Sequence, residues 1–432
     1  MPQWVDNIEQ ALRYYPLQIG TSGLIGMCLG LLGCFVVLRR MALIGDALSH
    51  AILPGVVIAF LTINLVIGHL SETAGLWGLF LGALIAGLIT AVGIGWVSRH
   101  SRAKEDSAIG IVFTAMFGLG VILISQLPEG THFDLTCFLF GEPLAIKSDD
   151  MLSIALVTPI VVSFVLIGFR ALRLLSFDPQ MAAAIGMKTN FWHYAFMGIL
   201  AAAVVAALRT VGVIMSVAML ITPAAAAYQL TNRLGTMLLL SGLFGATSAT
   251  FGFLAAFALN IPTGPAMVLF ATMIFVTVLA VAPEYGLISR FRRRRAILLH
   301  ILEEDILKTM LRHGRPIKQE ELVAIRFSAE KPTNIVRSVR RLLRGGFLVD
   351  SSNGLKLTTE GQRRGQLLLR SHRLWERYLA DEMVPDSLIH DTAERLEHAH
   401  HLAETLDQKL GSPTTDPHGE PIPEKPENAS KY

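Results

Sequence analysis

Charged residues are scarce in the first two-thirds of this 432-residue sequence. Only 25 of its 71 charged side chains precede Arg290, and the other 46 lie from there to the end. Long apolar runs fill the charge-poor part, and about 20 apolar residues in a helix cross the hydrocarbon core of a bilayer. These runs are continuous and lack the alternation of a barrel strand. The sequence therefore predicts an all-α membrane domain with many spans, followed by a soluble, helix-rich domain.

Several functional signatures are missing as well. The three cysteines, Cys28, Cys34 and Cys137, have no CxxC spacing and cannot form a disulfide framework. Residues 1–16 lack the basic start and cleavage site of a signal peptide, and we interpret them as an amphipathic lead-in. The sequence has no GxxxxGK(S/T) phosphate loop, because Gly-Met-Lys-Thr at 186–189 lacks the required spacing. We therefore expect the chain not to be an enzyme and any ATP hydrolysis to belong to a separate subunit.

The apolar runs predict nine spans, although a count of eight or ten also fits the pattern. They are placed at residues 17–38, 51–68, 74–97, 108–126, 151–169, 193–208, 211–229, 236–259 and 264–283. Basic residues favour cytoplasmic connections, and they gather at alternate connections, from Arg39 and Arg40 to the run Arg290–Arg295. We therefore expect a multi-pass protein of the cytoplasmic (inner) membrane, with the amino terminus outside and the carboxyl-terminal domain in the cytoplasm.

An acid–imidazole pair lies at the start of the second apolar run. Asp46 and His50 are four residues apart and share one face of a helix. Ionisable groups at membrane depth are costly and usually functional, and this donor pair suits Mn, Fe or Zn better than Mg or Ca. The pair could instead only order a helix end beside Arg39 and Arg40. The chemistry alone does not choose between these interpretations.

The surrounding motifs resemble the zinc/manganese/iron permease family of ABC importers. The matching segments are LRRMALIGDALSHAILPG (38–55), EDSAIGIVFTAMFGLGVILIS (105–125), CFLFGEPLAI (137–146), FDPQMAAAIGM (177–187) and ALRTVGVIMSVAMLITPAAAAYQL (207–230). The resemblance implies a permease that pairs with a second copy or a paralogue, receives a metal ion from an extracytoplasmic binding protein, and is driven by an ABC ATPase subunit. It makes Asp46 and His50 candidate metal contacts on the translocation path.

The same resemblance assigns two further regions. The segment with Asp178, Pro179 and Gly186 becomes the coupling helix that docks on the ATPase, although an ordinary amphipathic loop helix fits the residues equally. Asp134 and Glu142 could face the binding protein, but we favour solvated loop acids for both.

Residues after Arg295 predict a winged helix-turn-helix. Helices are expected at 300–313, 319–327 and from 332–333 to 345–346, followed by a hairpin at 347–358 around Asn353–Gly354. Four arginines form one basic face of the third helix, as a DNA recognition helix would, although a solvated face is the simpler interpretation. They are Arg337, Arg340, Arg341 and Arg344.

Residues 387–406 predict one helix with metal-ligand side chains on a single face. Counted from the first of them, five residues lie at sequence offsets of 0, 4, 7, 8 and 11, namely His390, Glu394, Glu397, His398 and His401. Imidazoles and carboxylates without a thiolate favour Mn or Fe. The alternative interpretation is a solvent-exposed polar helix, which would show the same residues.

Residues from about 300 to 423 resemble the regulators of the diphtheria toxin repressor and manganese transport regulator family. The matching segments are LTTEGQRRGQLLLRSHRLWERYL (357–379), IHDTAERLEH (389–398) and GSPTTDPHGEPIP (411–423). The resemblance implies one metal site at His372, Glu376 and His390 and another at Asp305, Glu394, Glu397 and His398. A carboxylate at 394 favours manganese. Lys308 falls on a further ligand position, and we expect its side chain to point away from the site.

These inferences give five regions and one leading function. The regions are a lead-in (1–16), the permease domain (17–289), a winged helix-like domain (296–362), a helical metal-binding and dimerisation-like region (363–411) and a disordered tail (412–432). The leading function is the permease subunit of an ABC importer for manganese, then iron or zinc, with the metal as substrate and regulatory ligand and no tightly bound cofactor. The alternative is a membrane-anchored, metal-dependent DNA-binding regulator. A secondary carrier is disfavoured because buried charges are scarce.

Overall fold

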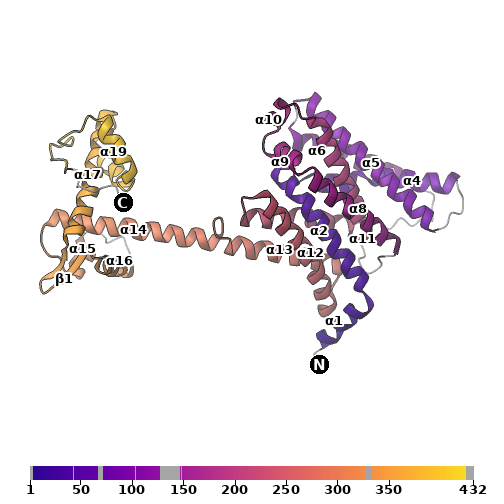
Figure 1. Cartoon of the computed structure of the whole chain (residues 1–432), viewed down its shortest axis with the longest axis horizontal. Helices are drawn as coiled ribbons and strands as arrows, with labels where there is room; N and C mark the ends of the chain where they lie inside the picture. Colours follow the sequence, from indigo (N-terminus) through magenta and orange to yellow (C-terminus); the bar gives the residue numbers. More distant parts are fainter. Residues whose placement is uncertain are drawn as a thin grey trace. The chain divides into compact units, whose positions relative to one another are not determined.

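The computed structural model describes residues 3–41, 43–66, 72–102, 104–126, 146, 148–325 and 332–424. The chain separates into two compact units, residues 1–289 and 290–432 (Figure 1). Each unit is described by itself below.

The first unit is built from helices throughout its described residues. They are α1 (Gln3–Tyr14), α2 (Pro16–Leu38), α3 (Leu43–Ala51), α4 (Leu53–Val66), α5 (Glu72–His100), α6 (Glu105–Ser125), α8 (Ser148–Ile167), α9 (Phe169–Phe177), α10 (Pro179–Ala184), α11 (Thr189–Leu230), α12 (Leu234–Leu259) and α13 (Thr263–Val281). Within the described ranges, nine helical segments are long and apolar enough to cross a bilayer. The predicted all-α membrane domain is therefore confirmed.

The observed bounds depart most from the predicted ones at the second span and at the boundary between the sixth and the seventh. The second begins at Leu43, because α3 and α4 follow each other with only Ile52 between them. The sixth and seventh both lie in α11, which breaks at Gly212 (φ 78°, ψ 174°) and not between residues 208 and 211. Glycine adopts this positive φ without the Cβ clash that other residues meet.

Helix α11 folds back on itself at that break. The ring of Phe196 lies 6.0 Å from that of Phe35, and the carbonyl of Leu220 packs against Gly33. Residues 196 and 220 thus meet neighbouring positions of α2, although a straight helix would separate them by about 36 Å. The two halves of α11 are therefore separate spans that pack on the same helix.

Helix α2 packs closely on α12 because small residues line the contact. A Cβ on Gly26 would lie 2.2 Å from the carbonyl oxygen of Gly245, so neither position admits a side chain. Nearby, the Ser241 hydroxyl donates to the carbonyl of Gly30 at 2.6 Å. Small residues let membrane helices approach until backbone atoms touch, and this contact fixes the centre of the bundle.

The second unit begins with a winged helix-turn-helix. It consists of α14 (Leu287–His313, whose first residues belong to the other unit), α15 (Gln319–Ile325), α16 (Pro332–Arg344), β1 (Leu348–Ser351) and β2 (Gly354–Leu357). The strands pair antiparallel, from Leu348 with Leu357 to Ser351 with Gly354. Apolar side chains of α14, α15, α16 and the hairpin form one core. The predicted winged helix is therefore confirmed.

Three further helices form a second core in this unit. They are α17 (Thr359–Asp381), α18 (Asp386–Leu396) and α19 (His400–Lys409). Leu374 and Trp375 of α17 pack against Ile389 of α18 and Leu406 of α19. The predicted single helix over 387–406 is wrong, because the chain leaves the helix at 397–399. Burial of the Glu397 side chain against other helices outweighs local helix propensity there.

Residues 412–424, which were predicted to begin a disordered tail, instead pack on α17. Thr415 and Pro421 form a β-bridge, and Ile422 is buried in the second core. Arg373 pairs with Asp416 and Glu420. The Pro-rich composition suggested disorder, but a buried isoleucine and these ion pairs hold the segment in place.

Candidate metal sites and coupling loop

Asp46 and His50 lie on α3, the short helix at the start of the second span. The Nε2 atom of His50 is 3.5 Å from Oδ1 of Asp46. The Asp46 side chain is 51% exposed and that of His50 is 23% exposed within the single chain. The imidazole packs against the rings of Phe113 and Phe117 on α6. The pair therefore presents two metal-binding groups, a carboxylate and an imidazole, and the imidazole lies against aromatic rings.

Two donors are too few to enclose a transition-metal ion, which takes four or more ligands. Among the described residues, groups of three or more metal-ligand side chains occur only in the second unit. The predicted Asp46–His50 pair therefore does not by itself supply a full coordination shell. Asp134 and Glu142 lie outside the described residues.

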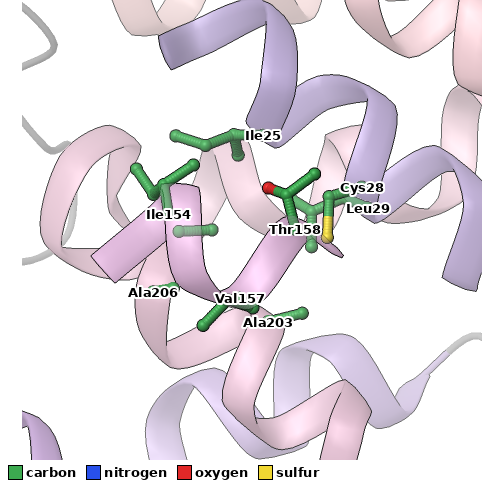
Figure 2. Close-up of a pocket in the computed structure, with 9 residues that line it drawn as sticks. Ile25, Cys28, Leu29, Ile154, Val157, Thr158, Ala203 and Ala206 are labelled. Atoms are coloured by element: carbon green, nitrogen blue, oxygen red, sulfur yellow. The ribbon is translucent and has the colours of Figure 1, made fainter. Parts of the chain in front are cut away.

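A small gap inside the bundle has no metal-binding character. Figure 2 shows side chains of α2, α8 and α11 around it, with Cys28 and Thr158 as its polar members. Its free volume of about 10 Å³ is at the lower limit for one water molecule. The surrounding side chains are otherwise apolar, so this gap is a packing defect between helices.

The predicted coupling segment forms a short exposed helix. Asp178 caps α10, because its Oδ1 accepts a hydrogen bond from the backbone N–H of Met181 at 2.8 Å. Gly186 follows the helix with φ +80°, a left-handed conformation that ends it. Phe177, Met181 and Ile185 are all more than half exposed. Large apolar groups on a short capped helix are typical of a docking surface.

Three of the predicted ligands in the second unit come together. His372 and Glu376 are one turn apart on α17, and His390 reaches them from α18. Oε1 of Glu376 is 3.0 Å from Nε2 of His372 and 2.8 Å from Nδ1 of His390, and the two nitrogens are 3.2 Å apart. We call these three residues the α17–α18 site.

The geometry of the α17–α18 site fits a divalent ion. Ligands at right angles, each ~2.1 Å from an ion, lie ~3 Å from one another, as the three donor atoms do. His372 and Glu376 are buried, while His390 is half exposed and leaves an approach from solvent. Burial tends to raise the pKa of Glu376, but hydrogen bonds from His372 and His390 hold it at about 2. The carboxylate is therefore ionised and available as a ligand.

The His372 imidazole has a second carboxylate neighbour. Its Nδ1 lies 2.5 Å from Oε2 of Glu397. Burial tends to lower the pKa of His372, but the hydrogen bonds to Glu376 and Glu397 together raise it.

A second cluster contains Asp305, Glu397 and His398. Nε2 of His398 lies 3.7 Å from Oδ1 of Asp305 and 4.0 Å from Oε1 of Glu397. Our expectation that Lys308 points away from this cluster is wrong. Its side chain is fully buried, and Nζ contacts Oε1 of Glu397.

Glu394 does not join a ligand cluster with the other predicted residues. Its Oε1 lies 4.0 Å from Nζ of Lys308, so it faces the ammonium group. Two of the residues proposed for the second site, Glu394 and Glu397, therefore face a cation that belongs to the chain itself.

Sequence reasoning missed Glu304 as part of this cluster. Its side chain is buried, its Oε2 is 2.8 Å from Nδ1 of His398, and its Oε1 accepts from Arg364 at 2.8 Å. Burial tends to lower the pKa of His398, but Glu304 and Asp305 raise it. Glu304 precedes Lys308 by four residues, so the shared helical face was the available signal.

The four arginines of α16 are all exposed on one face, as predicted. They are Arg337, Arg340, Arg341 and Arg344. The side chain of Arg341 lies 3.5 Å from that of Glu303 of α14. This face could contact an anionic partner.

Comparisons with known proteins divide the chain in the same way. Residues 17–282 match the ABC 3 transport family, and residues 358–424 match the iron dependent repressor, metal binding and dimerisation domain. The chain is similar to the manganese transport system membrane protein MntC of Listeria monocytogenes, at 43% identity over 67% of this chain and 99% of that protein. The protein of the same name from Halalkalibacterium halodurans is 44% identical over 66% of this chain and 94% of its own length.

Two further relatives are informative about extent and fold. The manganese transport system membrane protein MntC of Bacillus subtilis is 32% identical over 86% of this chain and 88% of its own length. That coverage must continue into the second unit, because the first ends at residue 289. The solved structure of PsaBC from Streptococcus pneumoniae in complex with Fab covers 67% of this chain and 99% of the matched chain, with 35% identity and a TM-score of 0.57.

Proposed function

The chain belongs to the ABC 3 transport family, and from that premise we propose that it is the permease subunit of an ATP-driven importer of manganese. The observation that carries this proposal is the identity of 43–44% to manganese transport membrane proteins over nearly their whole length. Iron and zinc are the next substrates in order, since the same oxygen and nitrogen donors bind them. The transported ion is a substrate and not a resident cofactor.

The proposed partners follow from the family assignment. An ABC ATPase subunit would supply the energy of transport, in keeping with the lack of a phosphate loop in this sequence. An extracytoplasmic metal-binding protein would deliver the ion. We assign the ATPase contact to α10, whose exposed Met181 and the neighbouring Ile185 offer an apolar docking surface.

Asp46 and His50 are the proposed metal contacts on the translocation path. A second permease copy or a paralogue would bring an equivalent pair, and two pairs related by a two-fold axis supply four donors. Four donors from carboxylates and imidazoles are enough for a transient transition-metal site. The half-exposed Asp46 supports this arrangement, because its carboxylate is accessible from outside the single chain.

We assign the second unit to the cytoplasm, as a regulatory module that responds to the imported metal. The match of residues 358–424 to a metal binding and dimerisation domain supports metal sensing, and the donors of the α17–α18 site supply the ligands. Its regulatory effect would act on transport. A membrane-anchored DNA-binding regulator is the second candidate, supported by the exposed arginine face of α16.

Uptake of radioactive manganese by membrane vesicles tests the leading proposal. The vesicles carry the full chain, the ATPase and the binding protein. Uptake that needs ATP and all three proteins, with manganese preferred over zinc and iron, supports the assignment. Metal uptake without the ATPase would contradict it. Salt-dependent binding of a DNA duplex by the purified chain would instead favour the second candidate.

A further inference from the structure

Lys308 occupies an unusual position for a charged side chain. Lys308 belongs to α14 and is fully buried. Lysine is almost never buried without an ionic partner, since an unpaired charge in the interior costs several kcal/mol. Its ammonium group contacts Oε1 of Glu397 and lies 4.0 Å from Oε1 of Glu394. A positive charge of the chain itself is thus held among carboxylates.

The ammonium group lies where a metal ion would have to bind. An ion coordinated by Glu397 in the cluster with Asp305 and His398 must lie ~2.1 Å from a Glu397 oxygen. Oε1, the oxygen of Glu397 on that side, is already in contact with Lys308. A divalent ion and an ammonium group cannot share one oxygen at these distances, because two positive charges would then be only a few ångströms apart. The donors of this cluster therefore do not fit a metal ion.

The other oxygen of Glu397 points to the α17–α18 site. Oε2 lies 2.5 Å from Nδ1 of His372, and both atoms are buried. Nε2 of the same ring faces Glu376 and His390. A metal-ligating histidine commonly donates its second ring N–H to a carboxylate, which fixes the ring and its tautomer. Glu397 has this position relative to His372.

We propose that Lys308 replaces a metal ion in the second cluster, so that the unit takes one divalent ion, at His372, Glu376 and His390. Glu397 is then an orienting carboxylate for His372 and not a metal ligand. Lys308 holds Glu397 in that role at all metal concentrations. The proposal rests on the proposed function in one respect, the binding of a divalent ion at the α17–α18 site.

The test counts manganese ions on the full chain in detergent, by equilibrium dialysis with manganese chloride and elemental analysis. Lys308→Glu removes the ammonium group and adds a carboxylate among Asp305, Glu394 and His398. We expect this variant to bind about one ion more per chain than the unaltered protein, because the cluster then contains a ligand set suited to Mn. Electron paramagnetic resonance should show the broadened signal of two neighbouring Mn ions. Lys356→Glu, the same change at an exposed position of the wing, should add none.

A second pair of variants guards against misfolding of Lys308→Glu. Lys308→Met leaves Glu397 buried without its cation, so the metal-free melting temperature should fall by on the order of 10 °C. The double variant Lys308→Met, Glu397→Gln removes both charges and should recover most of that loss. An unchanged melting temperature in Lys308→Met would overturn the proposal, as would equal manganese content in folded Lys308→Glu and the unaltered chain.

Two further variants separate the proposal from its premise. Glu397→Gln should weaken manganese binding by about 10–100-fold without abolishing it, as the loss of an orienting carboxylate does. Complete loss of manganese binding in this variant would indicate that Glu397 is a metal ligand and would overturn the proposal. His390→Ala tests the α17–α18 site by itself. Full manganese content in this variant would reject that site, whatever melting temperature Lys308→Met has.

Discussion

The hydroxyl of Ser371 donates a hydrogen bond of 2.8 Å to the backbone carbonyl of Glu397. Both residues are fully buried. The bond ties α17 to the turn between α18 and α19, at the point where the chain leaves the helix. It therefore sets the direction in which the Glu397 side chain leaves the backbone, toward Lys308 and His372.

Ser371→Ala should destabilise the second unit. The substitution leaves a buried carbonyl without its donor, which costs about 1–3 kcal/mol. Calorimetric unfolding of the full chain in detergent should show the transition of this unit lowered by several degrees. Ser338→Ala is the matched control, because the Ser338 hydroxyl is buried on α16 without a hydrogen-bond partner among the described residues. Equal shifts in both variants would contradict the assigned role of Ser371.

Sequence periodicity was sufficient for much of this architecture. Continuous apolar runs predicted the spans, and the turn signal at Asn353–Gly354 predicted the wing, because both patterns are local in sequence. The ligand types of His372, Glu376 and His390 were recognised from spacing and family resemblance. The structure brings these three residues within hydrogen-bond distance of one another.

The errors arose where distant contacts decide the outcome. Lys308 and Glu397 are 89 positions apart, so no local pattern shows that the lysine points inward. The break after Leu396 is not visible in the composition of 387–406, because burial of Glu397 and its bond to Ser371 impose it. The packing of 412–424 depends similarly on Ile422 entering a core formed by other helices.

Asp46→Asn and His50→Ala should each reduce manganese uptake by at least about 10-fold. Loss of even an outer-shell group lowers metal affinity or activity by about 10–100-fold, and these two residues are the proposed ligands themselves. ATP-dependent uptake by vesicles is the measurement, with membrane insertion checked by the amount of protein in the membrane fraction. His100→Ala on α5 is the control, since this histidine is exposed and its ring pairs with the carbonyl of Trp96 one turn earlier in the same helix. Normal uptake by both variants would remove the pair from the translocation path.

Gly186→Leu should uncouple ATP hydrolysis from transport. The residue has φ +80°, which costs a non-glycine residue about 1–2 kcal/mol and displaces the end of α10. The added side chain would also project from the exposed surface that is proposed to dock on the ATPase. In reconstituted complexes, we expect fewer manganese ions transported per ATP hydrolysed. Gly411→Leu, at φ +69° in the second unit, carries similar strain away from the loop. An equal effect of both substitutions would place the coupling surface elsewhere.

Manganese should raise the melting temperature of the second unit, and His390→Ala should remove that effect. A ligand that binds only the folded state at 100 times its dissociation constant stabilises it by about 2.7 kcal/mol, which corresponds to several degrees for a unit of this size. His390 is the informative ligand because its side chain is 50% exposed. Its loss removes a donor without opening the core, whereas a change at buried His372 would also disturb Glu397. Asp391→Ala, at the exposed neighbouring position, should keep the manganese response. Calorimetry with and without a chelator measures both variants, and a manganese shift that survives His390→Ala would mean that the stabilising ion binds outside the α17–α18 site.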